Sequence, residues 1–227
     1  MPELAATETS RACVRSRRCT ISKHLILWKR RFPRKIRYIL INKPTGVTTS
    51  AVREKINNAV PTVYDLLDSL GIDTIGLGCV GRLDQDTSGA LLFTDDGKLN
   101  RKVRGSKSHA KKLYKLVIFS GASISAEQLD SLSSPLDSET FPATVEIVTR
   151  WVDVVKGSSS DYTCNFIELL VTLVEGKHRQ IRRLCTRAKL RVSSLTRIAF
   201  GPVLLGDLPE GHARPLTSEE VELLKSC

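Results

Sequence analysis

Short runs of apolar residues, separated by turn residues, predict both strands and helices along most of this chain. Four runs of six to nine residues are rich in Val, Ile, Leu, Phe or Tyr, which is typical of strands. They are residues 36–42, 89–94, 113–119 and 166–174. The first run ends at Pro44-Thr45-Gly46 and the second at Asp95-Asp96-Gly97, and both of these sequences predict turns.

Apolar residues at helical spacing predict four helices, three of which begin with an N-cap residue. The helices are expected at 61–70, 125–132, 180–188 and 217–225. Thr62, Ser125 and Thr217 have side chains that accept hydrogen bonds from backbone N–H groups of a first helical turn. Gln128 follows Ser125 by three residues and Glu220 follows Thr217 by three, which is the spacing of a capping box.

The order of these elements predicts the fold class. Strands and helices are interspersed, without the regular alternation of a doubly wound sheet. We therefore expect an α+β fold with a largely antiparallel sheet. The Gly- and Ser-containing stretch 156–161 predicts a surface loop.

Positive charge is concentrated at the start of the chain. The net charge is +11, and residues 1–37 contribute +9 of it with eleven Lys or Arg and two acids. The remainder holds 24 basic and 22 acidic residues. We expect residues 1–35 to be an extension and not core. An organellar transit peptide, a disordered RNA-binding arm and a misassigned gene start all fit this composition. A transit peptide predicts a mitochondrion or plastid, and otherwise we expect the cytoplasm.

Two later stretches are strongly basic. Residues 98–115 and 177–197 each hold eight Lys or Arg and no acid, whereas a solvated surface normally mixes both signs. Such stretches favour a polyanionic partner, with nucleic acid ahead of anionic lipid and of an ordinary charged surface. Binding through phosphate contacts would depend strongly on salt.

Neither a metal site nor a membrane span is predicted. The six cysteines, at positions 13, 19, 79, 164, 185 and 227, include no Cys-x-x-Cys pair and have no histidine at ligand spacing. Zinc and a disulfide framework are therefore not indicated. The longest apolar stretches are well short of the roughly 20 residues that a membrane-spanning helix needs.

One polar loop stands directly before a predicted buried strand. Residues 81–89 read GRLDQDTSG and lead into the strand at 89–94. Rigid scaffolds commonly present reactive side chains on such loops. The pattern fits equally well a loop whose Arg and Asp side chains only bond to backbone groups.

This loop and four other motifs resemble those of a known enzyme family. The others are YILINKPTGVTTS at 38–50, Lys112-Leu113-Tyr114, EGKHRQIRR at 175–183 and GPVLLGDLPEGHARPL at 201–216. In this order they resemble the pseudouridine synthases of the bacterial ribosomal type, in the branch whose founding member acts on small-subunit rRNA. The resemblance covers residues 36–225. It implies isomerisation of a uridine in structured RNA, with ribosomal RNA as the expected substrate.

The resemblance also implies an architecture. We expect a two-lobed α+β catalytic domain at 36–227 around a central mixed sheet, with the active cleft between the lobes and with neither cofactor nor metal ion. Many members carry an N-terminal S4 RNA-binding domain, for which residues 1–35 are too few, so a short member without it is expected. We expect a monomer whose partner is rRNA or a ribosomal precursor and not a membrane.

Three catalytic residues are implied by the same motifs. Asp84 matches the catalytic carboxylate, which must be ionised whether it attacks covalently or removes a sugar proton. Arg182 matches the basic residue that holds this carboxylate ionised. Tyr114 matches the aromatic residue that stacks on the target base and serves in proton removal at its ring. As alternatives, Arg182 is one more RNA-facing charge and Tyr114 is an ordinary core residue.

A second set of residues is expected to bind the substrate. Leu195 matches an apolar residue of the pocket, although a leucine in a strand is also ordinary core. Arg82 resembles a residue that helps to flip or replace the extruded nucleotide, and its alternative is a salt bridge with Asp86. The remaining substrate-binding residues come from the two basic stretches: Lys112, Lys177, Arg179, Gln180 and Arg183.

Two rival functions stay open. A descendant that has lost catalysis would bind or chaperone rRNA, although Asp84, Tyr114 and Arg182 are all present. A pseudouridine synthase acting on transfer or messenger RNA would carry the same motifs, because these describe the reaction and not the position that is modified.

Overall fold

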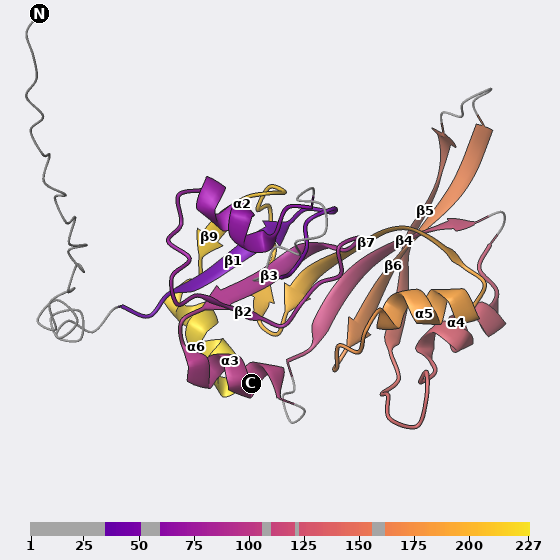
Figure 1. The fold of residues 1–227 in the computed structure, drawn as a ribbon. Helices are drawn as coiled ribbons and strands as arrows, with labels where there is room; N and C mark the ends of the chain where they lie inside the picture. The colour runs from indigo at the N-terminus through magenta and orange to yellow at the C-terminus, as the bar shows by residue number, and fades with distance from the viewer. Residues whose placement is uncertain (1–34, 51–59, 106–109, 121–122, 156–161) are drawn as a thin grey trace, which may run out of the picture. The chain divides into compact units, whose positions relative to one another are not determined.

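Nine strands form a single mixed sheet in the part of the chain that the structure describes. The structure, a computed structural model, describes residues 35–50, 60–105, 110–120, 123–155 and 162–227. The strands are β1 (Tyr38–Lys43), β2 (Gly78–Val80), β3 (Ser88–Thr94), β4 (Lys112–Ser120), β5 (Thr144–Val155), β6 (Tyr162–Leu173), β7 (Arg191–Phe200), β8 (Val203–Leu204) and β9 (Ala213–Pro215). Their order is β5-β6-β4-β7-β3-β1-β9, with β2 paired to β3 and β8 to β7 (Figure 1). All of them belong to the unit Ile36–Cys227, one of two into which the chain divides.

Five helices accompany the sheet in these residues. They are α2 (Val63–Ser69), α3 (Gly97–Arg104), α4 (Ala126–Ser133), α5 (Gln180–Arg187) and α6 (Ser218–Ser226). The four predicted helices are confirmed as α2, α4, α5 and α6. Thr62, Ser125 and Thr217 are the N-caps of three of them, and each forms a complete capping box. No described helix is long and apolar enough to cross a membrane.

Helix α3 stands where a turn was predicted at Asp95-Asp96-Gly97. The Asp96 carboxylate accepts hydrogen bonds from Lys98 N and Leu99 N, both at 3.0 Å, and so caps a helix that begins at Gly97. Only Leu99 and Val103 of this helix are buried. An Asp-Gly pair serves a hairpin turn or a helix start, and too few apolar residues follow it here for the periodicity to decide.

The four predicted strands are confirmed as β1, β3, β4 and β6, and the α+β fold with a largely antiparallel sheet is confirmed as well. Every strand pairing is antiparallel except that of β3 with β7. The sequence pattern does not predict β5 or β7. Most of β5 is exposed and therefore lacks apolar–polar alternation, while Arg, Ser and Thr interrupt the buried positions of β7.

Alternate side chains of the central strands build two hydrophobic clusters on opposite faces of the sheet. In β3, Leu91 and Phe93 join the larger cluster, whereas Ala90 and Leu92 join the smaller one. Helices α4 and α5, which lie side by side against the β4–β7 half in Figure 1, contribute to the larger cluster. Helices α3 and α6 contribute to the smaller cluster.

Two residue pairs join the halves of the sheet. Strands β3 and β7 run parallel and pair only at Ser88–Thr196 and Gly89–Arg197 among the described residues. Gly89 has a φ of +105°, and a Cβ atom there would lie 2.2 Å from the Arg197 carbonyl oxygen. Only glycine fits at this position without displacing the neighbouring strand. The polar loop at 81–87 leads directly into this junction.

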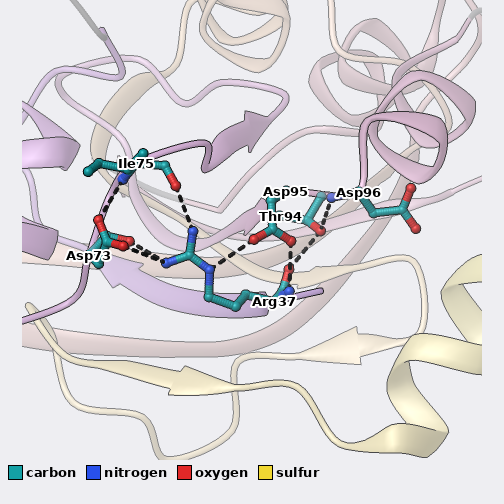
Figure 2. Close-up of polar contacts among 6 residues, drawn as sticks. All are labelled: Arg37, Asp73, Ile75, Thr94, Asp95 and Asp96. Carbon is teal, nitrogen blue, oxygen red and sulfur yellow. Dashed lines mark hydrogen bonds and ion pairs between the residues drawn. The ribbon is translucent and has the colours of Figure 1, made fainter. Parts of the chain in front are cut away.

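A hydrogen-bonded cluster around Arg37 fixes the start of β1 to the end of β3 (Figure 2). The Arg37 backbone N–H donates to Asp95 Oδ1 at 2.7 Å, and its Nε donates to Asp95 Oδ2 at 2.9 Å. Its terminal nitrogens donate to the carbonyl oxygens of Asp73 and Ile75, and Thr94 Oγ1 donates to the Arg37 carbonyl. Burial raises the pKa of Asp95, but the hydrogen bonds from Arg37 outweigh it and bring the pKa below its ordinary 3.8.

Replacing Gly89 by alanine should lower the free energy of unfolding by about 3 kcal/mol or more, because the added methyl group overlaps the Arg197 backbone. Gly97→Ala is the matched control, since an added Cβ there meets no atom within 4 Å and Gly97 begins a helix. Urea denaturation of both variants measures the difference. Wild-type stability in Gly89→Ala would contradict the close approach of the two strands.

The Asp95 carboxylate should stabilise the fold above about pH 4 and lose that contribution as the pH falls, because its pKa is lower in the folded chain than in the unfolded one. Asp95→Asn should therefore reduce the loss of unfolding free energy between about pH 5 and about pH 3. The control is Asp130→Asn, which removes an exposed carboxylate of α4 without a side-chain bond to any described residue. If wild type and Asp95→Asn lose stability equally on acidification, the contact with Arg37 is not the cause.

Candidate active site

A cavity of about 290 Å³ opens where the two halves of the sheet meet. Its walls come from the loop before β3, from β4, from the segment that leads into α5, and from β7. Asp84, Tyr114 and Leu195 line it together, although they come from three separate parts of the chain. The volume is near the lower end for ligand sites, so the cavity suits one small group of a larger ligand.

Backbone contacts fix the loop that carries Asp84. Thr49 Oγ1 donates to the Leu83 carbonyl at 2.8 Å, and Gly46 N donates to the Gln85 carbonyl at 2.8 Å. Leu83 is buried, so the residue before Asp84 is anchored in the core. The Asp84 carboxylate is half-buried and forms neither a hydrogen bond nor an ion pair with any other described residue. Its oxygen atoms are therefore held at the cavity and remain available.

A fully buried lysine also contacts this loop. Lys43 Nζ donates to the carbonyl oxygens of Pro44 at 2.7 Å, Val47 at 2.8 Å and, more weakly, Gln85 at 3.4 Å. Burial lowers the pKa of Lys43 to about 8, and nearby carboxylates oppose this shift. The ammonium group thus ties the turn after β1 to the loop that carries Asp84.

Asp86, two residues after Asp84, holds two arginines. Its carboxylate accepts hydrogen bonds from Arg179 Nη1 at 3.0 Å and Nη2 at 2.8 Å. Arg182 Nε lies 3.1 Å from Asp86 Oδ2, and Arg182 Nη2 donates to the Asp86 carbonyl at 2.6 Å. Burial raises the pKa of Asp86, but the hydrogen bond from Arg179 and the charges of both arginines lower it below its ordinary value.

The segment before α5 is a fixed turn that directs these arginines. Glu175 Oε1 accepts from Gln180 Nε2 at 2.8 Å, and Gln180 Oε1 accepts from the Lys177 backbone N–H at 3.2 Å. The helix then begins after Arg179, whose backbone is left-handed with a φ of 50°. Side chains with a Cβ atom seldom adopt this region.

Tyr114 and Leu195 form an apolar wall of the cavity. Both are buried members of the larger core cluster and lie on the neighbouring strands β4 and β7. The Tyr114 hydroxyl forms no hydrogen bond with a described residue. An aromatic ring beside an aliphatic side chain offers a packing surface for a planar group.

Two further cations line the cavity beside Phe200. Arg197 is 2% exposed, donates from Nε to the Ala90 carbonyl at 2.7 Å, and lies 5.2 Å from the centre of the Phe200 ring. Lys112 Nζ lies 5.6 Å from the same ring and donates to the Val174 carbonyl at 3.2 Å. Burial lowers the pKa of Lys112, and the charge of Arg197 adds to this shift.

Nine of the ten residues predicted to form the site line this cavity. They are Asp84, Tyr114, Arg182, Arg82, Leu195, Lys112, Lys177, Arg179 and Gln180. Arg183 is exposed on α5 and is not among the described residues that line the cavity. Gln180 is buried and already bonded to Glu175 and Lys177, so it shapes the turn before α5.

The ion pairs differ from those expected. The motif predicts that Arg182 pairs with Asp84, but in the structure Arg182 pairs with Asp86. A salt bridge of Arg82 with Asp86 was the alternative for Arg82, but Asp86 is instead engaged by Arg179 and Arg182, and Arg82 is exposed. The loop carries two acids two residues apart, and the start of α5 decides which of them the arginines reach.

The sequence motifs do not single out several residues that line or support the cavity. Those are Lys43, Thr87, Val103, Arg104, Leu173, Ile181, Arg197 and Phe200. A signal existed for two of them. Lys43 is the one charge that ends an apolar run, and Arg197 is a charge within the apolar end of β7.

The arrangement supports carboxylate chemistry on a group that packs against the apolar wall. Asp84 is the only carboxylate among the described residues that line the cavity, while cations line several of its sides. Among the same part of the chain, no group of three or more His, Cys, Asp or Glu side chains could hold a metal ion. A fixed, ionised acid can act as nucleophile or as general base.

Known proteins with similar sequences and structures belong to one family. A family model described as RNA pseudouridylate synthase matches residues 37–187. The ribosomal small subunit pseudouridine synthase A of Vibrio parahaemolyticus is 31% identical over 192 residues, covering 82% of this chain and 73% of that protein. An uncharacterized RNA pseudouridine synthase of Bacillus subtilis is 32% identical over 194 residues, covering 82% and 72%. The crystal structure of a pseudouridylate synthase matches with a TM-score of 0.64 and 30% identity, covering 84% of this chain and 74% of that one.

Lys43→Ala should lower the free energy of unfolding by about 2–5 kcal/mol, because backbone carbonyls lose their donor and a buried void opens. Lys98→Ala, which shortens an exposed lysine on α3, should change it by less than about 0.5 kcal/mol. Urea denaturation of the purified variants gives both values. Wild-type stability in Lys43→Ala would show that the ammonium group does not hold the turn and the loop together.

Proposed function

This chain belongs to the RNA pseudouridylate synthase family, and we propose that it converts a uridine of ribosomal RNA to pseudouridine with Asp84 as its catalytic carboxylate. As a member of this family it is an isomerase that acts on uridine within RNA. One observation carries the assignment of Asp84. It is the only carboxylate among the described residues that line the cavity, and no described side chain pairs with it.

The choice of ribosomal RNA rests on a relative and on charge. The protein of Vibrio parahaemolyticus is named for the ribosomal small subunit. Both basic stretches of this chain contribute cations to the cavity walls, among them Arg104, Lys112 and Lys177, which suit phosphate groups. The described walls all come from one chain, so we infer that a monomer suffices and that the reaction needs no metal ion.

The reaction breaks the bond between N1 of uracil and C1′ of the ribose and forms a bond between C5 and C1′. The base turns between these steps, the proton on C5 leaves, and N1 gains a proton. No atom is added and no electron acceptor is needed. One ionised carboxylate can start this sequence by attack on carbon or by removal of a sugar proton, and Asp84 serves either course.

The target nucleotide must leave the RNA stack before Asp84 can reach its sugar. We assign Tyr114 and Leu195 to the flipped base, with the Tyr114 hydroxyl taking part in proton removal at C5. The exposed Arg82 would contact or fill the position that the base leaves. Lys112, Lys177 and Arg179 would contact the phosphates beside it.

Cells that carry the intact protein, lack it, or carry only Asp84→Asn should differ at one position of their rRNA. Pseudouridine is detected there as a carbodiimide-dependent stop in primer extension, and this stop should be absent without the protein and with Asp84→Asn. The purified variant should be slower than wild type by roughly a thousandfold or more, because the cavity walls offer no second described carboxylate.

Asp130→Asn is the control for the loss of one acid and should keep the stop. A stop that persists with Asp84→Asn would refute the role of Asp84. Loss of a stop from transfer or messenger RNA instead would show that the substrate is not ribosomal. No change in any RNA would favour a catalytically silent RNA-binding protein.

A further inference from the structure

We propose that Asp86 is a positioning residue for the isomerisation, one that holds Arg179 and Arg182 at the cavity wall and so leaves the Asp84 carboxylate unpaired for the RNA. The inference deepens the proposed function and rests on it. Among the described residues, Arg179 and Arg182 line the cavity and Asp86 does not. Asp86 therefore acts through its two partners and not on the substrate.

The contacts of Asp86 engage both carboxylate oxygens and its carbonyl. Arg179 forms a fork with Oδ1 and Oδ2, at 3.0 and 2.8 Å. Arg182 takes the remaining positions, with Nε 3.1 Å from Oδ2 and Nη2 2.6 Å from the carbonyl oxygen. Fork-shaped pairs between guanidinium and carboxylate fix direction as well as distance. One acid thus sets the orientation of two cations.

The backbone of Arg179 is adapted to the same contact. Its left-handed φ of 50° lies at the N-cap of α5, and its side chain makes no capping hydrogen bond to the helix. Residues with a Cβ atom keep such a conformation only where the surroundings hold them in it. Arg182 follows three residues later, so both side chains leave the same turn. The turn before α5 therefore directs both arginines at Asp86.

Without Asp86, these guanidinium groups would have Asp84 as the remaining acid of the loop. The pKa of Arg179 is raised by the hydrogen bond to Asp86 first, and the charge of Asp84 raises it as well, so Asp84 lies within electrostatic range. A carboxylate paired with a guanidinium is a weaker base and nucleophile, because the cation stabilises its charge. Such a pair would have to break before Asp84 could meet the ribose.

Asp86→Asn tests this separation of roles. The amide has nearly the size of the carboxylate but lacks the charge that holds two guanidinium groups, so the arginines should move toward Asp84. The kcat should fall by about 10- to 100-fold. The KM for RNA should stay within about twofold or decrease, because both cations remain available to phosphate. A loss of fold alone would not separate kcat from KM in this way.

Three further variants make the result specific. Asp86→Glu keeps the charge and should recover most of the lost kcat. Arg179→Lys keeps a cation but cannot form the fork, and it should lower kcat in the same direction by a smaller factor. Asp130→Asn should leave kcat and KM unchanged. Thermal unfolding of each purified variant shows whether it is folded.

A wild-type kcat in folded Asp86→Asn would overturn the inference, and so would a failure of Asp86→Glu to recover activity. If Asp86→Asn does not fold, Arg179→Lys decides, and an unchanged kcat there overturns it. Asp84→Asn measured beside them separates the two proposals. An active Asp84→Asn contradicts the proposed function itself, whereas an inactive Asp84→Asn with a fully active Asp86→Asn contradicts only the role of Asp86.

Discussion

The close approach of Gly89 to the Arg197 backbone holds the two halves of the sheet together. A hydrogen atom in place of a side chain lets β3 and β7 pair in parallel, and this is the one parallel strand pairing in the described sheet. The loop at 81–87 enters β3 at this junction. Strand β7 brings Leu195 to it, and β4, paired to β7, brings Tyr114. The cavity exists because one position of the chain has no Cβ atom.

Around this junction the protein surrounds one acid with cations without pairing it. The ammonium group of Lys43 is bonded to backbone carbonyls, and the guanidinium group of Arg197 is bonded to a carbonyl and lies over an aromatic ring. The two arginines at the start of α5 are engaged by Asp86. Positive charge is thereby fixed near Asp84 before any substrate arrives, and groups oriented in advance need no rearrangement during a reaction.

The sequence predicts those features whose signal is local. The capping boxes at Thr62, Ser125 and Thr217 are confirmed because each is decided within four residues. The motifs also identify most residues of the cavity, since their order reflects the family's fold. The edge strand β5 has no such signal because most of its residues are exposed. The partner of Arg182 could not be predicted either, since the tertiary position of α5 chooses between two acids of one loop.

The position of β9 bears on how the protein is made. Strand β1 pairs with β3 on one side and with β9, residues Ala213–Pro215, on the other. A ribosome releases the chain from its N-terminal end, so β1 and β3 emerge long before β7 and β9. Pairings between such distant segments form late and slow the folding of a domain. The loop that carries Asp84 therefore becomes rigid only after nearly all of the described chain has been translated.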